Sequence, residues 1–262
     1  MIELQPQINA NLNTLFKGHE HNLAVLSILK GKIDTKIYVD KVEPNWAVTR
    51  ANNRIFLAGS YSDPEAFEAI EKVIQTGIKE GRTGFIIYYS HGADCLVGEN
   101  INGVKPYPNL RNYYEFELNS KLSQNIPSGY RVARITPELI GIGYNNSEIV
   151  MQEMQSERPS LDDFFEKSFS FCTLKDDTIT SWCMSEYNVG KRFEIGIETH
   201  PNYRKKGLAI CAAKACINHG FDNGYKIVGW HCWKDNLASN KTAIRLGFEF
   251  KLEYKIEYLE IV

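Results

Sequence analysis

The stretch that decides the fold is "ETHPNYRKKGLAICAAKACINHG", residues 198–220, where a basic turn leads into a helix rich in small residues. Arg204, Lys205 and Lys206 come directly before Gly207, where the helix is expected to begin. One interpretation is a solvated basic turn. The other is an anion site, because the first amides of a helix lack partners and form the positive end of its dipole.

The elements around this stretch predict a mixed α/β sheet. Before it, "RVARI" at 131–135 alternates as a strand, Thr136 and Pro137 begin a helix, and Ser160 caps another. Polar turns then separate three expected strands, which makes them an antiparallel meander. These strands cover residues 169–174, 179–186 and 192–199.

Beyond the basic turn we expect a strand–helix–strand crossover. The helix covers about 207–223, and "YKIVGWHCW" at 225–233 is apolar enough for a buried strand. A second helix in "NLASNKTAIRLGF" ends at Gly247, and the alternating residues 249–261 form a last strand. A meander that passes into a crossover leaves a gap between neighbouring strands, at which a helix N-terminus points.

The N-terminal half predicts a second α/β domain. Strands at 36–40, 46–51 and 54–61 precede a helix that Asp63 caps, and "GFIIYYS" is a further buried strand. This order repeats that of the C-terminal half, so we infer a degenerate copy of the same fold, with an acidic loop that would not hold phosphate. The segment 118–129 is the linker candidate, which gives domains of 1–125 and 126–262.

Composition narrows the classes of function. The net charge is −2 and the pI about 6.3, which argues against a nucleic-acid binder held by bulk electrostatics. No apolar run is long enough to span a membrane, and the start lacks the pattern of a secretory signal, so we expect a cytosolic protein. None of the six cysteines forms a CxxC pair, which predicts reduced, mostly buried thiols and no metal site.

Two sequence blocks carry the chemistry. Arg204 to Ala209 fits R/Q-x-x-G-x-G/A, where Gly207 permits a close backbone approach and the amides of residues 205–209 can surround a pyrophosphate. From Asn236, "NLASNKTAIRLGF" fits N-x-x-S-x-x-x-A-x-x-x-G-F. Together the two blocks resemble those of the GNAT superfamily of acyl-CoA-dependent N-acyltransferases. Their amino-acid sequences are similar to the branch of zwittermicin-A-resistance-type acetyltransferases. The resemblance covers about residues 131–262.

This resemblance implies a GNAT fold, acetyl-CoA as co-substrate and an N-acetyltransferase that acts by direct attack of an amine. The pyrophosphate would bind the Arg204–Ala209 loop, and the pantetheine arm would pair with the end of the strand before it. Asn236 and Ser239 match positions that contact the arm. The residues implied in cofactor binding are Ile197, Thr199, Arg204, Lys205, Lys206, Gly207, Leu208, Ala209, Asn236 and Ser239.

Catalytic residues are less sharply indicated. Glu194 and Glu198 are four apart on one strand, so they share a face and are candidate general bases, with Glu186 as a third candidate. Many family members carry a tyrosine acid four residues before the helix-ending glycine, but here that residue is Ala243. Either the thiolate leaves without a side-chain acid, or another residue supplies the proton, and Cys232, His231 and Tyr203 are nearby in sequence. We expect His231 and Cys232 to pack under the second helix.

Two functions therefore stay open. The first is acetyl transfer to a small-molecule amine, with neither nucleic acid nor membrane as partner, by a monomer or a homodimer. The second is a non-catalytic acyl-CoA-binding or regulatory module, which the missing tyrosine at Ala243 favours.

Overall fold

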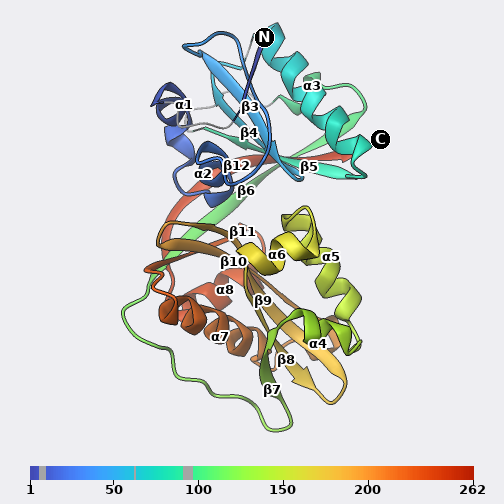
Figure 1. The fold of residues 1–262 in the computed structure, drawn as a ribbon, viewed down its shortest axis with the longest axis vertical. Helices are drawn as coiled ribbons and strands as arrows, with labels where there is room; N and C mark the ends of the chain where they lie inside the picture. The colour runs from blue at the N-terminus through green and yellow to red at the C-terminus, as the bar shows by residue number, and fades with distance from the viewer. Residues whose placement is uncertain (6–9, 62, 91–96) are drawn as a thin grey trace. The chain divides into compact units, whose positions relative to one another are not determined.

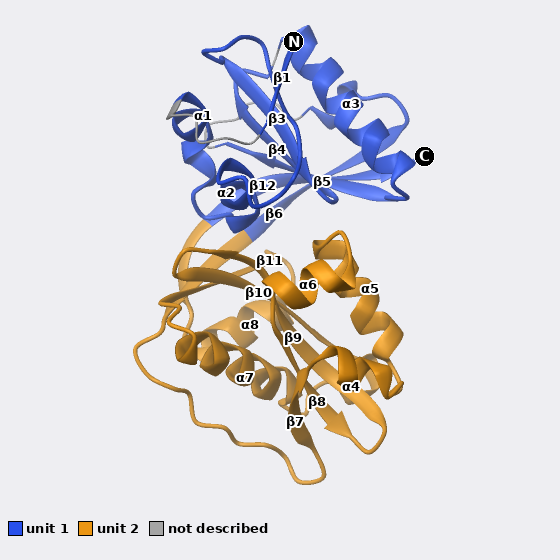
Figure 2. Cartoon of the chain, viewed as in Figure 1, with its two compact units in different colours: residues 1–111, 253–262 blue, residues 112–252 orange. Residues whose placement is uncertain are grey.

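The structure is a computed structural model that describes residues 1–5, 10–61, 63–90 and 97–262. Two compact units divide it: residues 1–111 with 253–262, and residues 112–252 (Figure 2). The division falls inside strand β6 (Val104–Glu117), upstream of the boundary near residue 125, which stays a prediction. The last residues belong to the first unit because β12 (Glu249–Ile261) pairs there with β5.

The first unit contains short helices, one long helix and a set of strands (Figure 1). Its elements, besides its share of β6 and β12, are β1 (Ile2–Leu4), α1 (Ala10–Leu15), η1 (Phe16–His19), α2 (Leu23–Leu29), β2 (Ile37–Val39), β3 (Trp46–Ala51), β4 (Arg54–Gly59), α3 (Pro64–Lys79), β5 (Gly84–Tyr89) and η2 (Gly98–Asn100). The sequence "PQINANLNTLFKG" at 6–18 predicts a helix; residues 6–9 lie outside the described residues, and α1 and η1 cover residues 10–19.

The three-strand and helix unit predicted between residues 36 and 89 is confirmed. Strands β2, β3 and β4 pair antiparallel in that order, and β4 pairs parallel with β5. Helix α3 begins at Pro64 after its cap Asp63, whose side chain accepts a hydrogen bond from the amide of Glu65. The apolar face of α3 packs on these strands through Ile70, Ile74 and their neighbours, so burial of that face holds the unit together.

The second unit has helices on both faces of its strands (Figure 1). Its elements, besides its share of β6 and β12, are β7 (Arg131–Ile135), α4 (Pro137–Gly141), α5 (Ser147–Glu157), α6 (Leu161–Lys167), β8 (Ser170–Lys175), β9 (Thr178–Val189), β10 (Arg192–Thr199), η3 (Pro201–Tyr203), α7 (Leu208–Asp222), β11 (Ile227–Trp233) and α8 (Leu237–Leu246). Helices α7 and α8 share one apolar core with β10 and β11, and α4–α6 share the other with β8 and β9.

The predicted meander and crossover are both confirmed. Strands β8, β9 and β10 pair antiparallel, α7 follows, and β11 pairs parallel with β10. Twelve strands lie in the described residues, hydrogen-bonded in the order β1-β2-β3-β4-β5-β12-β6-β11-β10-β9-β8-β7. The sheet is mixed, as the sequence predicts, and none of the described helices is long and apolar enough to cross a membrane.

Two segments differ from expectation. Strand β6 was not predicted, because Pro106 and Pro108 argue against a strand. The two prolines are two residues apart, so both missing N–H groups fall on the same edge of the strand. The 118–129 segment forms no helix or strand, but it lies along α7: Asn218 bonds both backbone groups of Leu122, at 2.7 and 2.9 Å.

The prediction of buried, reduced cysteines is confirmed for the five that lie within the described residues, while Cys95 lies outside them. None of these five forms a disulfide, and all are buried: Cys172, Cys183, Cys211, Cys216 and Cys232. Burial raises the pKa of the Cys172 thiol to about 12, so this sulfur stays protonated and behaves as a small apolar group.

Candidate functional site

The candidate site is a cavity at the point where β10 and β11 separate. Their parallel pairing runs from Arg192↔Ile227 to Ile195↔Trp230, although β10 continues to Thr199 and β11 to Trp233. A cavity of about 640 Å³ lies on the α7 side of this gap. It is lined by β10, the basic loop, α7, β11 and α8, so the predicted separation of strands is present.

The loop before α7 adopts the conformation that an anion site needs. Lys205 and Gly207 have φ of +62° and +77°, and Gly207 is the N-cap of α7 without any side-chain hydrogen bond at the cap. A Cβ on Gly207 would meet open space, so glycine is required there by its backbone angle and not by crowding. The first amides of α7 therefore face the cavity without an intrahelical partner.

Positive charge surrounds this end of the cavity. Arg204 and Lys205 line it from the loop, and Lys241 and Arg245 line it from α8. Lys206 is not among the lining residues: its Nζ lies 3.5 Å from the carbonyl oxygen of Asn202 and 5.1 Å from the centre of the Tyr203 ring. The cations of the loop and of α8 can neutralise a bound pyrophosphate from two sides.

Arg204 is tied to the end of β10. Its Nε donates to the carbonyl oxygen of Thr199 at 3.1 Å, and a terminal nitrogen donates to Oε1 of Glu198 at 3.1 Å. The same Glu198 oxygen accepts the amide of Thr199 at 3.0 Å. Both charged side chains are about half exposed, so this ion pair adds little stability.

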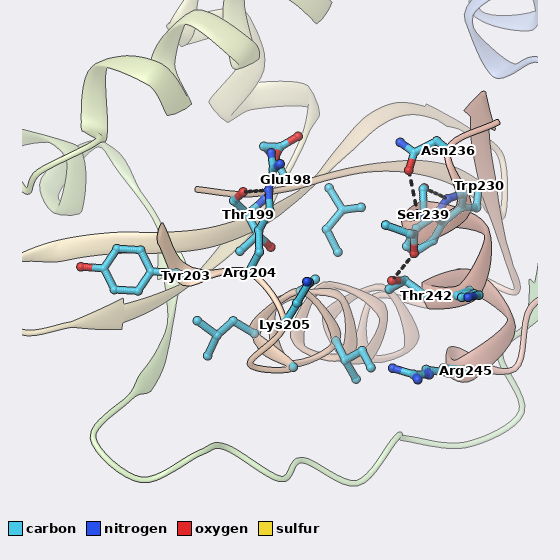
Figure 3. A pocket seen from close by; sticks show the side chains of 17 residues that line it. Glu198, Thr199, Tyr203, Arg204, Lys205, Trp230, Asn236, Ser239, Thr242 and Arg245 are labelled. Atoms are coloured by element: carbon cyan, nitrogen blue, oxygen red, sulfur yellow. Dashed lines mark hydrogen bonds and ion pairs between the residues drawn. The ribbon is translucent and has the colours of Figure 1, made fainter. Parts of the chain in front are cut away.

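The opposite wall comes from β11 and α8. Asn236 caps α8 by accepting the amide of Ser239 at 3.0 Å, and the hydroxyl of Ser239 accepts Nε1–H of Trp230 at 3.0 Å. Figure 3 shows these three residues on one side of the cavity, with Glu198, Thr199 and Arg204 on the other. Asn236 thus both caps the helix and lines the cavity.

The other predicted cofactor residues also line the cavity. Ile197, Leu208 and Ala209 are part of its wall. Ala243, which the sequence resemblance places at the position of a tyrosine acid, is fully buried in the core between α7, α8 and β11. Residue 243 therefore provides no side-chain hydroxyl that could act as an acid in the cavity.

The two predicted bases differ in their surroundings. Phe193, Ile195 and Ile197 point into the core with α7, so Glu194 and Glu198 share the opposite face, as the spacing predicts. Glu198 is exposed, lines the cavity and is paired with Arg204. Glu194 is buried, does not line the cavity, and lies 3.3 Å from Nε2 of His231.

An acidic group that the sequence did not reveal lies on the same sheet face as Glu198. Burial raises the pKa of Glu153 in α5 to about 7, although Nε1–H of Trp182 donates to its carboxylate and opposes the shift. Charges on Glu186, Glu198 and Glu157 raise it further. Glu186 lies over Gly196, where a Cβ would come within 2.2 Å of Oε1.

Three features of the cavity together indicate a phosphate-bearing ligand. They are the gap between the parallel strands β10 and β11, the positive φ of Gly207 before α7, and the cationic side chains that line the cavity. A family model of GNAT acetyltransferases matches residues 13–257. The chain belongs to the GNAT acetyltransferase family. Membership of this family implies an acyl-CoA co-substrate, and the residues of the cavity described above fit one.

Individual GNAT proteins are similar along nearly the whole chain. The uncharacterized N-acetyltransferase YdfB of Bacillus subtilis is 24% identical over 98% of this chain and 97% of its own length. A GCN5-related N-acetyltransferase-like protein from Streptococcus suis has a TM-score of 0.64 at 22% identity, covering 86% of this chain and 88% of its own. A tandem GNAT protein from the clavulanic acid biosynthesis pathway has a TM-score of 0.53 at 11% identity, covering 87% and 82%. These two structures show the shared fold.

Several residues that line the GNAT cavity were not singled out from the sequence. Ala238, Lys241, Thr242 and Arg245 all belong to α8. Their spacing of three, four and seven residues places them on one helix face, and this signal was available in the sequence. Ile210, which follows the basic loop in the chain, also lines the cavity and carried no comparable signal.

Proposed function

We propose that this GNAT protein transfers the acetyl group of acetyl-CoA to a primary amine of a small acceptor, by direct attack. The observation that carries this function is the cavity at the parted ends of β10 and β11, into which α7 directs its first amides. An extended ligand with phosphates at one end and a reactive group at the other matches its two ends.

In this proposal the pyrophosphate binds between the start of α7 and the cations of α8. The pantetheine arm runs past Ile197 and Thr199, where β10 no longer pairs with β11, and uses backbone groups that the gap leaves beside the cavity. Asn236 and Ser239 border the arm from the other wall. Lys206 would act only through its charge, because it does not line the cavity.

The proposed chemistry needs few dedicated side chains. An amine attacks the thioester carbon, a backbone N–H near Ile197 polarises the carbonyl, and the CoA thiolate leaves. Holding both reactants in one place supplies much of the rate. A carboxylate on β10, Glu194 or Glu198, is proposed to assist removal of the proton from the ammonium.

We also propose that the first unit is a degenerate copy of the fold that binds no cofactor. Within the described residues, β4 and β5 pair up to Leu57↔Tyr89, and the amide of Ser90 still donates to Leu57, so β5 stays bonded to β4 to its end. Asp63 and Glu65 stand at the start of α3, where they would repel phosphate. Membership of the zwittermicin-A-resistance-type branch likewise remains a proposal.

Isothermal titration of the full chain with acetyl-CoA tests the binding step, and thiol release over a panel of amines tests transfer. Mass spectrometry of each amine should show the addition of one acetyl group. No heat with acetyl-CoA at high protein concentration would exclude the function.

The alternative is a non-catalytic acyl-CoA-binding module. The observation that favours it is Ala243, which is buried where a catalytic tyrosine would stand. Tight binding of acetyl-CoA without transfer to any amine of the panel would support this alternative. We favour the enzyme, because a thiolate is a good leaving group and direct attack does not require that tyrosine.

A further inference from the structure

A buried histidine–glutamate pair lies beside the gap between β10 and β11. Nε2 of His231 is 3.3 Å from Oε1 of Glu194, and the two side chains are 6% and 1% exposed. His231 was expected to pack under α8, but only Cys232 does so. Because Trp230 and Cys232 point into the α7–α8 core, alternation along β11 turns His231 to the other face.

The imidazole ring is held in one orientation. The ring of Tyr113 in β6 stacks on it, with centroids 4.6 Å apart and planes at 24°. The Tyr113 hydroxyl donates to Glu115 at 2.5 Å and accepts from Arg192 at 3.0 Å, which fixes the stacking partner in turn. Burial and the bond to Glu115 raise the pKa of Tyr113, so its hydroxyl stays neutral.

A glycine makes room for this arrangement. Gly229 lies opposite Glu194 in the strand register and two residues before His231. A Cβ at Gly229 would come within 3.0 Å of Cγ of Glu194 and within 3.2 Å of the Tyr113 ring. The missing side chain lets the carboxylate cross the face of β11 and reach the imidazole.

The pair has a defined protonation pattern. If Glu194 is ionised, its carboxylate can only accept, so Nε2 of a neutral His231 carries the hydrogen and Nδ1 holds the lone pair. Oε1 of Glu194 lies 3.3 Å from Nε2 of the ring, and behind Tyr113 Arg192 forms an ion pair with Glu115 at 3.2 Å. A negative charge on Glu194 favours the imidazolium once it forms.

The position of the pair relates it to the reaction. Trp230, the residue before His231, is the last residue of β11 that pairs with β10. Trp230 and Ile197 border the gap and line the cavity on its other side. A thioester that reached the gap from the cavity would therefore meet the sheet face on which His231 lies.

We propose that His231 is the proton acceptor of the acetyl transfer and that Glu194 is the residue that positions it. This inference rests on the proposed function and gives Glu194 a role that acts through His231. The substrate ammonium gives one proton to Nδ1. The amine lone pair then forms the C–N bond, the C–S bond breaks with its electrons on sulfur, and a second amine proton passes to the thiolate. His231 finally releases its proton to water.

Kinetics of three variants test this assignment. His231→Gln should lower kcat about 100-fold or more at neutral pH, while the Kd for acetyl-CoA changes less than about twofold. The deficit should shrink as pH rises, because solution then supplies the neutral amine. Glu194→Gln should lower kcat about 10-fold and move the acidic limb of the pH profile to lower pH. The control is His219→Gln, a histidine of α7 that contacts the ring of Phe169 edge to face, and it should behave as wild type.

Wild-type turnover in His231→Gln, or a loss of equal size at every pH, would overturn the assignment. NMR of ¹⁵N-labelled histidine gives a readout without turnover. The neutral His231 ring should carry its hydrogen on Nε2, and Glu194→Gln should lower its titration midpoint by about one unit. A hydrogen on Nδ1, or an unchanged midpoint, would refute the pair. If the wild type acetylates no amine, the proposed function fails and the NMR result still decides the pair.

Discussion

The carboxylate of Glu186 lies against the α-carbon of Gly196, the first residue of β10 beyond its last pair with β11. Gly196→Ala would place a Cβ 2.2 Å from Oε1, and the flexible end of Glu186 would have to swing away. Because a carboxylate beside the gap attracts a cationic amine, we expect the KM for the amine to rise several-fold with little change in stability. Steady-state kinetics with one amine measures this.

Glu186→Ala provides the matched comparison. Since the two residues are in contact, their effects on KM should not add: Gly196→Ala in the Glu186→Ala background should change KM no further. Fully additive effects would show that the contact has no part in amine binding.

The left-handed glycine before α7 gives a second prediction. Gly207→Asp puts a carboxylate where the pyrophosphate is proposed to bind, so we expect no measurable acetyl-CoA binding by calorimetry. Gly224→Asp is the control, because Gly224 has φ of +79°, also faces open space, and follows α7 at its other end. Both variants pay a similar strain of about 1–2 kcal/mol. Equal affinity in the two would show that the loop does not hold the cofactor.

Glu153 makes stability depend on pH. Its pKa rises from about 4.5 to about 7 on folding, so the native state favours the protonated form. This contribution is complete below pH 4.5 and is lost as pH rises through 7, a change of about 3 kcal/mol in the free energy of unfolding. Glu153→Gln can still accept from Trp182, so we expect it to unfold like wild type at pH 4 and to be more stable at pH 8. Denaturant titrations at both pH values measure the difference, and equal stabilities at pH 8 would contradict the shift.

The variant Glu198→Gln distinguishes two roles of the Glu198 carboxylate: ion-pair partner of Arg204 or general base. Glu198→Gln releases Arg204 and removes a negative charge beside the cavity, so acetyl-CoA should bind at least as tightly as in wild type. If His231 is the proton acceptor, kcat should stay within about threefold, because the pair is exposed and weak. A fall of about tenfold or more at unchanged affinity would instead support the sequence-based role of Glu198 as the base.

The cofactor side of the site was predictable because it depends on local sequence. Gly207 sets a backbone angle, Asn236 caps a helix, and both lie at fixed places between a strand and a helix. The crossover follows from the apolar runs on either side of α7. These features need no knowledge of distant contacts.

The catalytic face was less predictable because it depends on pairs far apart in the chain. Glu194 contacts His231, and the ring of Tyr113 stacks on His231. Tyr113 lies in β6, a strand that its prolines made hard to predict. The shifted pKa of Glu153 likewise comes from its burial and from charges on other strands. Alternation placed Glu194 on the correct face, but only the strand register shows which side chain it reaches.

Because β5 stays paired with β4 to its end, we can predict how many acetyl-CoA molecules bind to one chain. The chain contains the three-strand and helix unit twice. Within the described residues, β10 and β11 both continue beyond their last pair with each other, whereas β5 ends at Tyr89, its last pair with β4. A calorimetric titration should therefore saturate at one acetyl-CoA per chain, whatever the sequence similarity between the two halves. The first unit is thus a control within the same polypeptide: it has a related fold, and we expect all acetyl-CoA binding that is measured to come from the second unit.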